Sequence, residues 1–249
     1  MRDSYVADIG DFGKYALLNA LAGNDLRLGV LWCRNSLAEV TKDGRFIAYP
    51  ELRECDSKLY DRLLQILASG RRTLSQVENN DILPKSTLFY GTAIPAPNAP
   101  CFSAAAREAQ TRLRGAWFDE AFAKLSEAEL VFLDPDNGIA AKRAKKHWRS
   151  SVKYVFKDEV TEWLKRGQSV VLYQHQQRRS LNEQVSEQQK ILATGKLCNA
   201  VSFHRRAARI YYILPGENHE ARISERLRSF LAGAWGDHFC AASDDQHLP

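Results

Sequence analysis

Three short, largely apolar runs, separated by segments with helical patterning, constrain the fold of this chain most. They are Leu26–Cys33, Glu129–Leu133 and Ser169–Tyr173. A strand that is apolar along its whole length must be buried on both faces, and a parallel sheet covered by helices on each side provides that environment. We therefore expect an α/β fold with a doubly wound, mostly parallel sheet.

The end of the chain predicts a different strand connection. Two further strands, Asn199–His204 and Arg209–Leu214, are separated by a short basic turn. Two strands joined so closely pair as an antiparallel hairpin. The expected sheet is therefore parallel at its centre and ends in a C-terminal antiparallel hairpin.

The length of 249 residues fits a single α/β domain over residues 1–249. An N-terminal helix is predicted over 10–22, and an irregular or inserted region over about 93–125. The first part of that region is rich in proline, which excludes helix and central strand, and a helical pattern runs from about 103 to 125. Further helices are expected over Ser57–Ala68, Asp158–Arg166, Ser180–Thr194 and Glu220–Leu231.

Composition excludes several classes of protein. The chain is 45% hydrophobic and carries charges of both signs, which excludes disorder as its main state. Its longest apolar runs fall far short of the roughly 20 residues of a membrane span, and its start lacks an apolar signal region. We expect a cytoplasmic protein without a membrane partner. The five cysteines are scattered without a C-x-x-C pair, so buried reduced thiols are expected rather than a disulfide framework or a zinc site.

The segment Asp134-Pro135-Asp136-Asn137-Gly138 directly follows an apolar strand. Ligands of open α/β sheets bind just beyond the carboxyl ends of the strands, and proline makes this turn stiff. In one interpretation, Asp134 accepts a hydrogen bond from the exocyclic amine of a base and Asn137 adds a second polar contact. In another, Asp134, Asp136 and Glu159 bind Mg²⁺ or Mn²⁺, because hard oxygen ligands suit these ions. All five residues are also common in turns without any further role.

Polar residues also follow the next strand. His175 would serve there as a general base near neutral pH. Arg178 and Arg179 stand beside it, and a guanidinium pairs well with phosphate oxygens.

Two basic clusters point to nucleic acid as a partner. The net charge of +5 is too small to decide this alone, so the placement of the charges matters more. Cationic side chains with an interleaved tryptophan suit phosphate attraction combined with base stacking. One cluster follows the Asp134–Gly138 turn and the other lies in the hairpin turn; their members are Lys142, Arg143, Lys145, Lys146 and Trp148, and Arg205 and Arg206.

The chain from Leu130 onward resembles the ribosomal RNA adenine-N6 methyltransferases, a branch of the class I S-adenosylmethionine enzymes. Asp134–Asn137 stands where that family carries its D/N-P-P-Y/F motif. The following order of helix, strand, capped helix ending at Ala193-Thr194-Gly195, hairpin and final helix is also similar. Asp11–Tyr15 resembles the A-D-V-L-K-H segment that opens the family's sequences.

The resemblance implies a Rossmann-like methyltransferase fold with S-adenosylmethionine as cofactor. It implies that Asp11 and Lys14 bind the cofactor, with Lys14 holding its carboxylate. The chain departs from the family pattern at Asp136 and Asn137, which replace a proline and an aromatic residue. It also departs at Arg34-Asn35-Ser36, where the family has a glycine-rich loop.

Three functions follow from these patterns. The first is a methyltransferase acting on an adenine amine in nucleic acid. The second is a metal-dependent nuclease or phosphodiesterase on the same scaffold, with His175 as base and Arg178 as phosphate anchor; the two departures favour it. The third is a catalytically degenerate module that binds nucleic acid.

Overall fold

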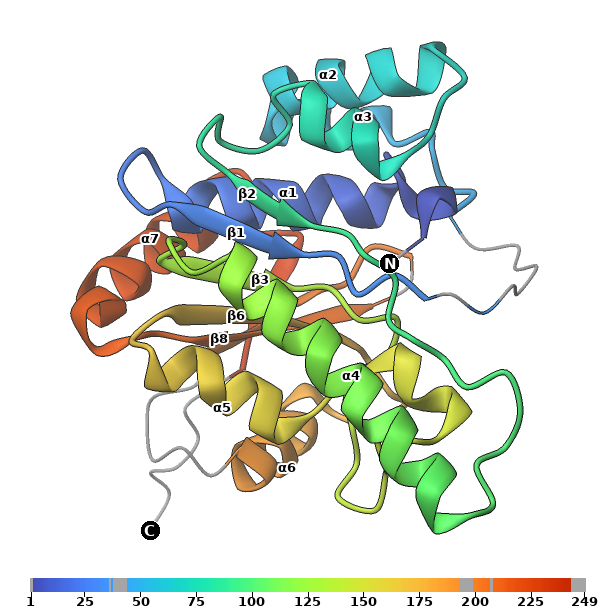
Figure 1. The fold of residues 1–249 in the computed structure, drawn as a ribbon. Coiled ribbons are helices and arrows are strands. Elements are labelled where there is room, and N and C mark those ends of the chain that lie inside the picture. Colours follow the sequence, from blue (N-terminus) through green and yellow to red (C-terminus); the bar gives the residue numbers. More distant parts are fainter. Residues whose placement is uncertain (1, 36, 38–43, 193–198, 207, 243–249) are drawn as a thin grey trace, which may run out of the picture.

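The structure is a computed structural model that describes residues 2–35, 37, 44–192, 199–206 and 208–242. It is a mixed α/β structure built on one seven-stranded sheet in the order β2-β1-β3-β6-β8-β7-β9 (Figure 1). The strands are β1 (Leu28–Leu31), β2 (Leu88–Tyr90), β3 (Leu130–Leu133), β6 (Ser169–His175), β7 (Asn199–Phe203), β8 (Arg209–Leu214) and β9 (Phe239–Ala241).

Most strands of this sheet run in one direction. β2, β1, β3 and β6 pair in parallel, as the apolar runs predict. β8 is antiparallel to both of its neighbours, β6 and β7, and β9 is antiparallel to β7. β1, β2, β3, β6 and β7 therefore run one way, and β8 and β9 run the other. Every residue of β1 and β3 is buried, because helices cover both faces of the sheet.

The helices form two layers, one on each face (Figure 1). Their packing divides the buried side chains into two hydrophobic clusters separated by the sheet. One layer contains α1 (Ile9–Ala22), α2 (Ser57–Ala68), α3 (Leu74–Asn79) and α7 (Glu220–Ala232), and the other contains α4 (Ala104–Lys124), α5 (Lys157–Lys165) and α6 (Leu181–Leu192).

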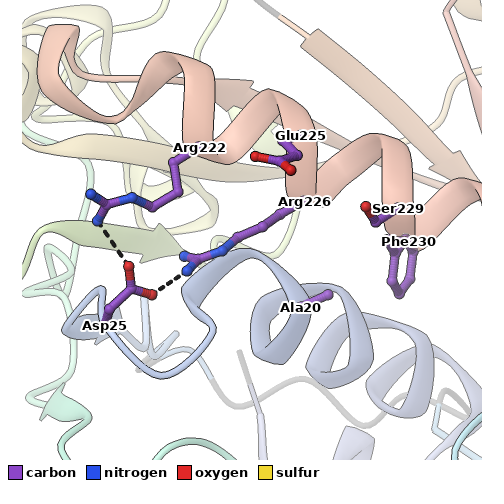
Figure 2. A pocket seen from close by; sticks show the side chains of 7 residues that line it. All are labelled: Ala20, Asp25, Arg222, Glu225, Arg226, Ser229 and Phe230. Carbon is purple, nitrogen blue, oxygen red and sulfur yellow. Dashed lines mark hydrogen bonds and ion pairs between the residues drawn. The ribbon is translucent and has the colours of Figure 1, made fainter.

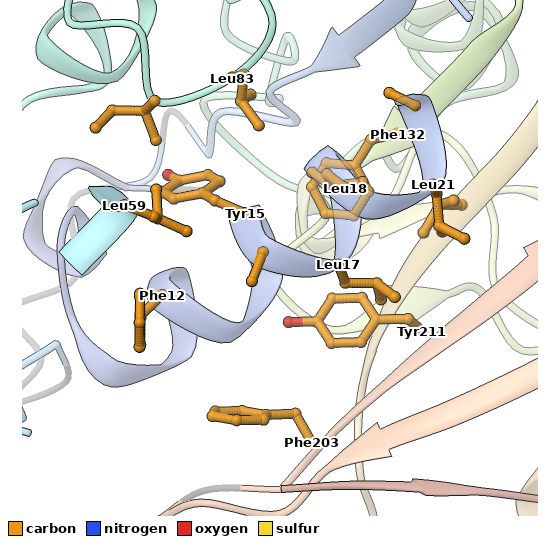
Figure 3. Close-up of a cluster of buried hydrophobic side chains, with 14 of the residues drawn as sticks. Phe12, Tyr15, Leu17, Leu18, Leu21, Leu59, Leu83, Phe132, Phe203 and Tyr211 are labelled. Carbon is orange, nitrogen blue, oxygen red and sulfur yellow. The ribbon is translucent and has the colours of Figure 1, made fainter. Parts of the chain in front are cut away.

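α1 lies at the centre of the first cluster. Its side chains Phe12, Leu17 and Leu18 are completely buried in the cluster that also contains Phe132 and Tyr211 of the sheet (Figure 3), and the Phe12 ring stacks on Tyr49. A helix that is buried on nearly every side is held in a fixed position relative to the strands. The polar residues of its first turn are therefore fixed as well.

The region 93–125 is irregular only in its first part. The chain from Gly91 to Ser103 has no helix, in agreement with its prolines, and α4 then continues for 21 residues. Trp117, Phe118 and Ala121 of α4 pack into the second cluster with Trp163 of α5. The helical pattern from 103 is confirmed, and α4 is an integral layer of the fold rather than an insertion.

The remaining elements are short. A two-stranded parallel ladder joins β4 (Gly138–Ile139) to β5 (Tyr154–Val155) beyond the edge of the main sheet. Within the described residues, no helix is both long and apolar enough to cross a membrane.

The helix end at 193–195 and Cys198 lie outside the described residues. The described cysteines are free thiols; Cys33 is buried as expected, whereas Cys240 is exposed. The described part of the chain also contains the 3-10 helices Asp3–Tyr5, Pro50–Cys55, Arg149–Lys153 and Glu217–His219.

Candidate functional site

The order of the strands locates the position where an open α/β sheet binds a ligand. From β1 the chain adds β2 on one side, and it then adds β3 and β6 on the other. Such a reversal is a topological switch point, and ligands bind outside the carboxyl ends of the two strands that flank it. These strands are β1, which is followed by Asn35, and β3, which is followed by Asp134 and Asp136.

A hydrogen bond crosses the switch point. The Asn35 Nδ2 atom donates to Asp136 Oδ2 at 2.8 Å, and the Arg2 guanidinium lies 3.4 Å from the same oxygen. Burial would raise the pKa of the Asp136 carboxyl, but the bond from Asn35 and the charge of Arg2 hold it below its ordinary value. Asp136 is therefore an anion at neutral pH, and it remains partly exposed.

Asn35 is itself held in place. Its Oδ1 atom accepts a hydrogen bond of 2.9 Å from the Leu37 amide, and its backbone forms an isolated parallel bridge with Ile94 after β2. Backbone and side chain together, Asn35 therefore connects the ends of three neighbouring strands.

Lys14 forms a second, fully buried ionic cluster. Its Nζ atom lies 2.7 Å from Asp11 Oδ1 and 3.0 Å from Asp134 Oδ2. α1 precedes β1 in the chain and runs antiparallel to it. The first turns of the helix therefore lie at the carboxyl edge of the sheet. Burial would lower the pKa of Lys14, but the two carboxylates reverse this and raise it above its ordinary value. Lys14 is thus the counter-ion of two carboxylates of this chain, whereas the resemblance implies a ligand of the cofactor's carboxylate.

Asp11 is a buried carboxyl group whose pKa is raised by its surroundings. It accepts hydrogen bonds from the Tyr15 hydroxyl at 2.9 Å and the Ala7 amide at 3.2 Å. Burial raises its pKa to about 6, with a further contribution from the nearby negative charge of Asp8, although Lys14 opposes the shift. Asp8 caps α1 by accepting the Asp11 amide at 2.8 Å.

The turn after β3 is fixed by its neighbours on β5 and β6. Asn137 Nδ2 donates to the Tyr154 hydroxyl at 3.0 Å. Asn137 stands where the similar family has an aromatic residue, and here the aromatic side chain of Tyr154 from β5 contacts that position instead. Gly138 has a φ of +113°, and a Cβ there would lie 2.0 Å from Gln174 Oε1. That oxygen accepts the Ile139 amide at 3.0 Å. Glycine is therefore required at position 138.

His175 ends β6 beside this turn. Its amide donates to the Asn137 carbonyl at 3.3 Å, and its side chain is exposed. Of the two arginines that follow, Arg178 is exposed and Arg179 forms an ion pair with Glu187.

Glu159 belongs to a different group of charges. Its carboxylate binds the fully buried Arg114, with N–O distances of 2.7 and 2.9 Å, and also accepts the Phe156 amide. Across the residues that the structure describes, no three His, Cys, Asp or Glu side chains are grouped to hold a metal ion. Glu159 is therefore an ion-pair partner of Arg114, and no metal site with Asp134 and Asp136 is formed there.

The basic residues lie in loops at the carboxyl edge. Lys142, Arg143 and Lys145 are exposed in the loop after β4, and Trp148 is 43% exposed. Lys146 differs from these residues because its ammonium group forms ion pairs with Asp158 and Glu159.

The other cluster lies in the turn between β7 and β8. Arg205 donates to Nδ1 of His238 at 2.8 Å. The guanidinium carbon of Arg206 lies 5.0 Å from the centre of the Phe46 ring.

The described residues form hollows at two separate places, one at strand ends of the sheet and one between helices. A hollow of about 420 Å³ is lined by Leu37, by residues 93–98 and by Arg149, next to Asn35 at the carboxyl ends of β1 and β2. The other, of about 550 Å³, lies between α1 and α7 (Figure 2). There Arg222 and Arg226 both bind Asp25, and Arg226 also caps the carbonyls that end α1. This second hollow thus surrounds a group of ion pairs and hydrogen bonds that joins α7 to the end of α1.

Several residues of the site were missed by the sequence patterns. Asn35 follows an apolar strand just as Asp134 does, so its position after Leu26–Cys33 was a usable signal. Arg2, Phe46 and Tyr154 carry no local signal, because distant segments bring them to the site. Asp8 marks the start of α1, a few residues before Lys14.

No protein-family model and no curated protein matches this sequence. The site must therefore be interpreted from its own geometry.

Proposed function

We propose that this chain binds nucleic acid at the carboxyl edge of its sheet and acts there as a methyltransferase-like enzyme on an exocyclic amine of a base. The observation that carries the proposal is the switch point between β1 and β3, where Asn35 and Asp136 are joined by a 2.8 Å hydrogen bond. The antiparallel β8 between β6 and β7 is the arrangement that the class I methyltransferase resemblance implies. The Rossmann-like methyltransferase fold is part of this proposal.

The roles of the turn residues follow from their exposure. Asp134 is 3% exposed and is paired with Lys14, so it fixes the turn. Asp136 and Asn137 are partly exposed at the edge, and their side-chain oxygens are suited to accept N–H bonds from an amine. Accepting those bonds would orient the nitrogen lone pair away from the turn. This role requires positioning and no strong base.

S-adenosylmethionine is the cofactor that the resemblance implies, and it supplies an electrophilic methyl group when bound. Lys14 does not suit its carboxylate, since the ammonium is buried between two carboxylates. The hollow beside Asn35 fits better. Its volume of about 420 Å³ lies within the usual range of ligand sites, and Arg149 provides a cation for the carboxylate.

The phosphates of the nucleic acid would meet the exposed cations of the same edge. Lys142, Arg143 and Lys145 lie after β4, and Arg178 lies after β6. Because this attraction is electrostatic, binding should weaken steeply as salt increases.

Calorimetric titration with S-adenosylhomocysteine tests the cofactor site. The wild type should bind it, and Arg149→Ala should weaken binding by roughly tenfold through loss of a charge-assisted contact. Arg112→Ala, at an exposed α4 arginine paired with Glu108, is the matched control and should bind as the wild type does.

Two other results would replace the proposal. Salt-dependent binding of nucleic acid without any binding of S-adenosylhomocysteine would indicate a binding module without this chemistry. Strand cleavage that requires Mg²⁺ or Mn²⁺ would indicate the hydrolase.

A further inference from the structure

Phe46, Arg45 and Arg206 form a cluster on the surface beside the candidate site. The guanidinium carbons of Arg45 and Arg206 lie 5.3 and 5.0 Å from the centre of the Phe46 ring. The Phe46 side chain is 37% exposed although it is large and apolar. We call these three residues the Phe46 cluster.

The segment that carries Phe46 is hydrogen-bonded to neighbouring parts of the fold. The Phe46 carbonyl accepts the amide of Ile9, the first residue of α1, at 2.9 Å. The Gly44 carbonyl accepts from the Arg72 guanidinium at 2.7 Å, and the same guanidinium binds Ser4. A Cβ on Gly44, which has a φ of +72°, would lie 2.0 Å from the Ser4 carbonyl oxygen. The backbone leading to Phe46 is thus closely packed.

Among the described residues, the two arginines of the cluster lack a carboxylate partner. Within the residues that the structure describes, no ion pair joins Arg45 or Arg206 to a carboxylate, whereas Arg209 nearby lies 3.5 Å from Asp8. Two cations held on one exposed ring repel each other, and an anion placed between or beside them would relieve that repulsion. An exposed ring with flanking guanidiniums also offers flat surfaces on which a base can stack.

The position of the cluster relates it to the proposed site. Ile9 follows Asp8, which caps the helix carrying Asp11 and Lys14. Arg206 lies in the turn after β7, two strands from β6 on the sheet. The hollow beside Asn35 lies on the β1–β2 side of the Asp134–Gly138 turn, and the Phe46 cluster lies on the β8–β7 side. A nucleic acid bound along the carboxyl edge of the sheet would therefore run from the turn towards the cluster.

We propose that the Phe46 cluster binds an unpaired nucleotide, with its base stacked on the phenyl and guanidinium surfaces and its phosphate bound by the arginines. The substrate class is therefore single-stranded or locally unpaired nucleic acid. This inference rests on the proposed function, because it assigns the substrate of that site.

Fluorescence anisotropy with a labelled 12-nucleotide single strand and the matching duplex tests the proposal. The wild type should bind the single strand more tightly. Phe46→Ala should weaken single-strand binding by about tenfold or more without changing its salt dependence, because stacking releases no counter-ions. Arg206→Ala should lower the slope of log affinity against log salt by about 0.7, the value for one phosphate contact on a single strand.

Two variants control for folding and for nonspecific effects. Phe46→Trp should retain binding, since it keeps an aromatic surface. Phe102→Ala removes a phenyl that is 82% exposed at the start of α4 and should bind as the wild type does. Equal binding by Phe46→Ala and Phe102→Ala would overturn the proposal, as would equal loss on single strand and duplex.

The two proposals fail differently. If the wild type binds single strands and Phe46→Ala binds them equally well, the cluster is wrong and the nucleic-acid site remains. If the wild type binds neither single strand nor duplex, both the cluster and the nucleic-acid function are wrong.

Discussion

Lys14 neutralises the two buried carboxylates of Asp11 and Asp134, so the stability of the fold should depend on its charge. Breaking a buried ion pair from one side costs about 3–5 kcal/mol, because charge is left without a partner. Lys14→Met should therefore lower the free energy of unfolding in urea by about this amount at pH 7. The loss should shrink as the pH falls towards 5, below the raised pKa of about 6 of Asp11, because a protonated Asp11 needs no cation.

Lys145→Met is the control for this variant, since Lys145 is exposed in the loop after β4. It should unfold as the wild type does. Wild-type stability in Lys14→Met would contradict the assignment of Lys14 as the counter-ion of Asp11 and Asp134.

Asp11 should make the free energy of unfolding fall as the pH rises, which is opposite to the usual effect of a carboxyl group. Its pKa in the folded protein is raised from 3.8 to about 6, mainly by burial. Between about pH 4 and 6 the folded state holds a proton that the unfolded state has lost, so this group's contribution to stability falls as pH rises through that window. Carbon-13 NMR of the carboxyl groups should show a midpoint nearer 6 than 4. The signal should vanish in Asp11→Asn, and a midpoint at or below 4 would refute the environment described.

At the scale of elements, Arg114 connects α4 to the segment that supports the candidate turn. It binds Glu159 of α5, the Ser151 carbonyl at 3.0 Å and the Tyr154 carbonyl at 2.8 Å. Tyr154 in turn contacts Asn137. The ion pair therefore acts on the site indirectly, through the position of β5.

A double-mutant cycle measures this connection. Arg114→Met alone should destabilise the protein by about 3–5 kcal/mol, since it removes the closest cation of the buried Glu159 and leaves only Lys146, 3.7 Å away. Adding Glu159→Gln should recover part of the loss, so the double variant is more stable than the sum of the single effects predicts. Additive single effects in urea unfolding would show that the two side chains are not coupled.

The elements that the sequence predicts well are those whose pattern is local. α1 begins and ends within one residue of the expected range, and α2 matches it fully. The capping box of α6 is also present, with Ser180 and Glu183 exchanging hydrogen bonds. β4 and β5 were missed, because each has two residues and is defined by a partner distant in sequence.

At the scale of the whole molecule, the sheet order sets which predicted residues meet. The position of Asp134 beyond a buried strand could be predicted from the apolar run before it. Its pairing with Lys14 could not, because 120 residues separate the two. The alternative metal set of Asp134, Asp136 and Glu159 is not grouped among the described residues, since Glu159 is bound by Arg114. Local patterns thus locate strand ends, while long-range packing selects the partners.

Methyl transfer tests the central claim most directly. Wild-type protein, a single-stranded oligonucleotide and S-adenosylmethionine with a radiolabelled methyl group should yield a labelled exocyclic amine. Asp136→Ala should reduce the rate by about a hundredfold through loss of positioning, whereas Asp119→Ala, at an exposed aspartate of α4, should leave it unchanged. No incorporation by the wild type at saturating cofactor, with the strand shown to be bound, would contradict the account.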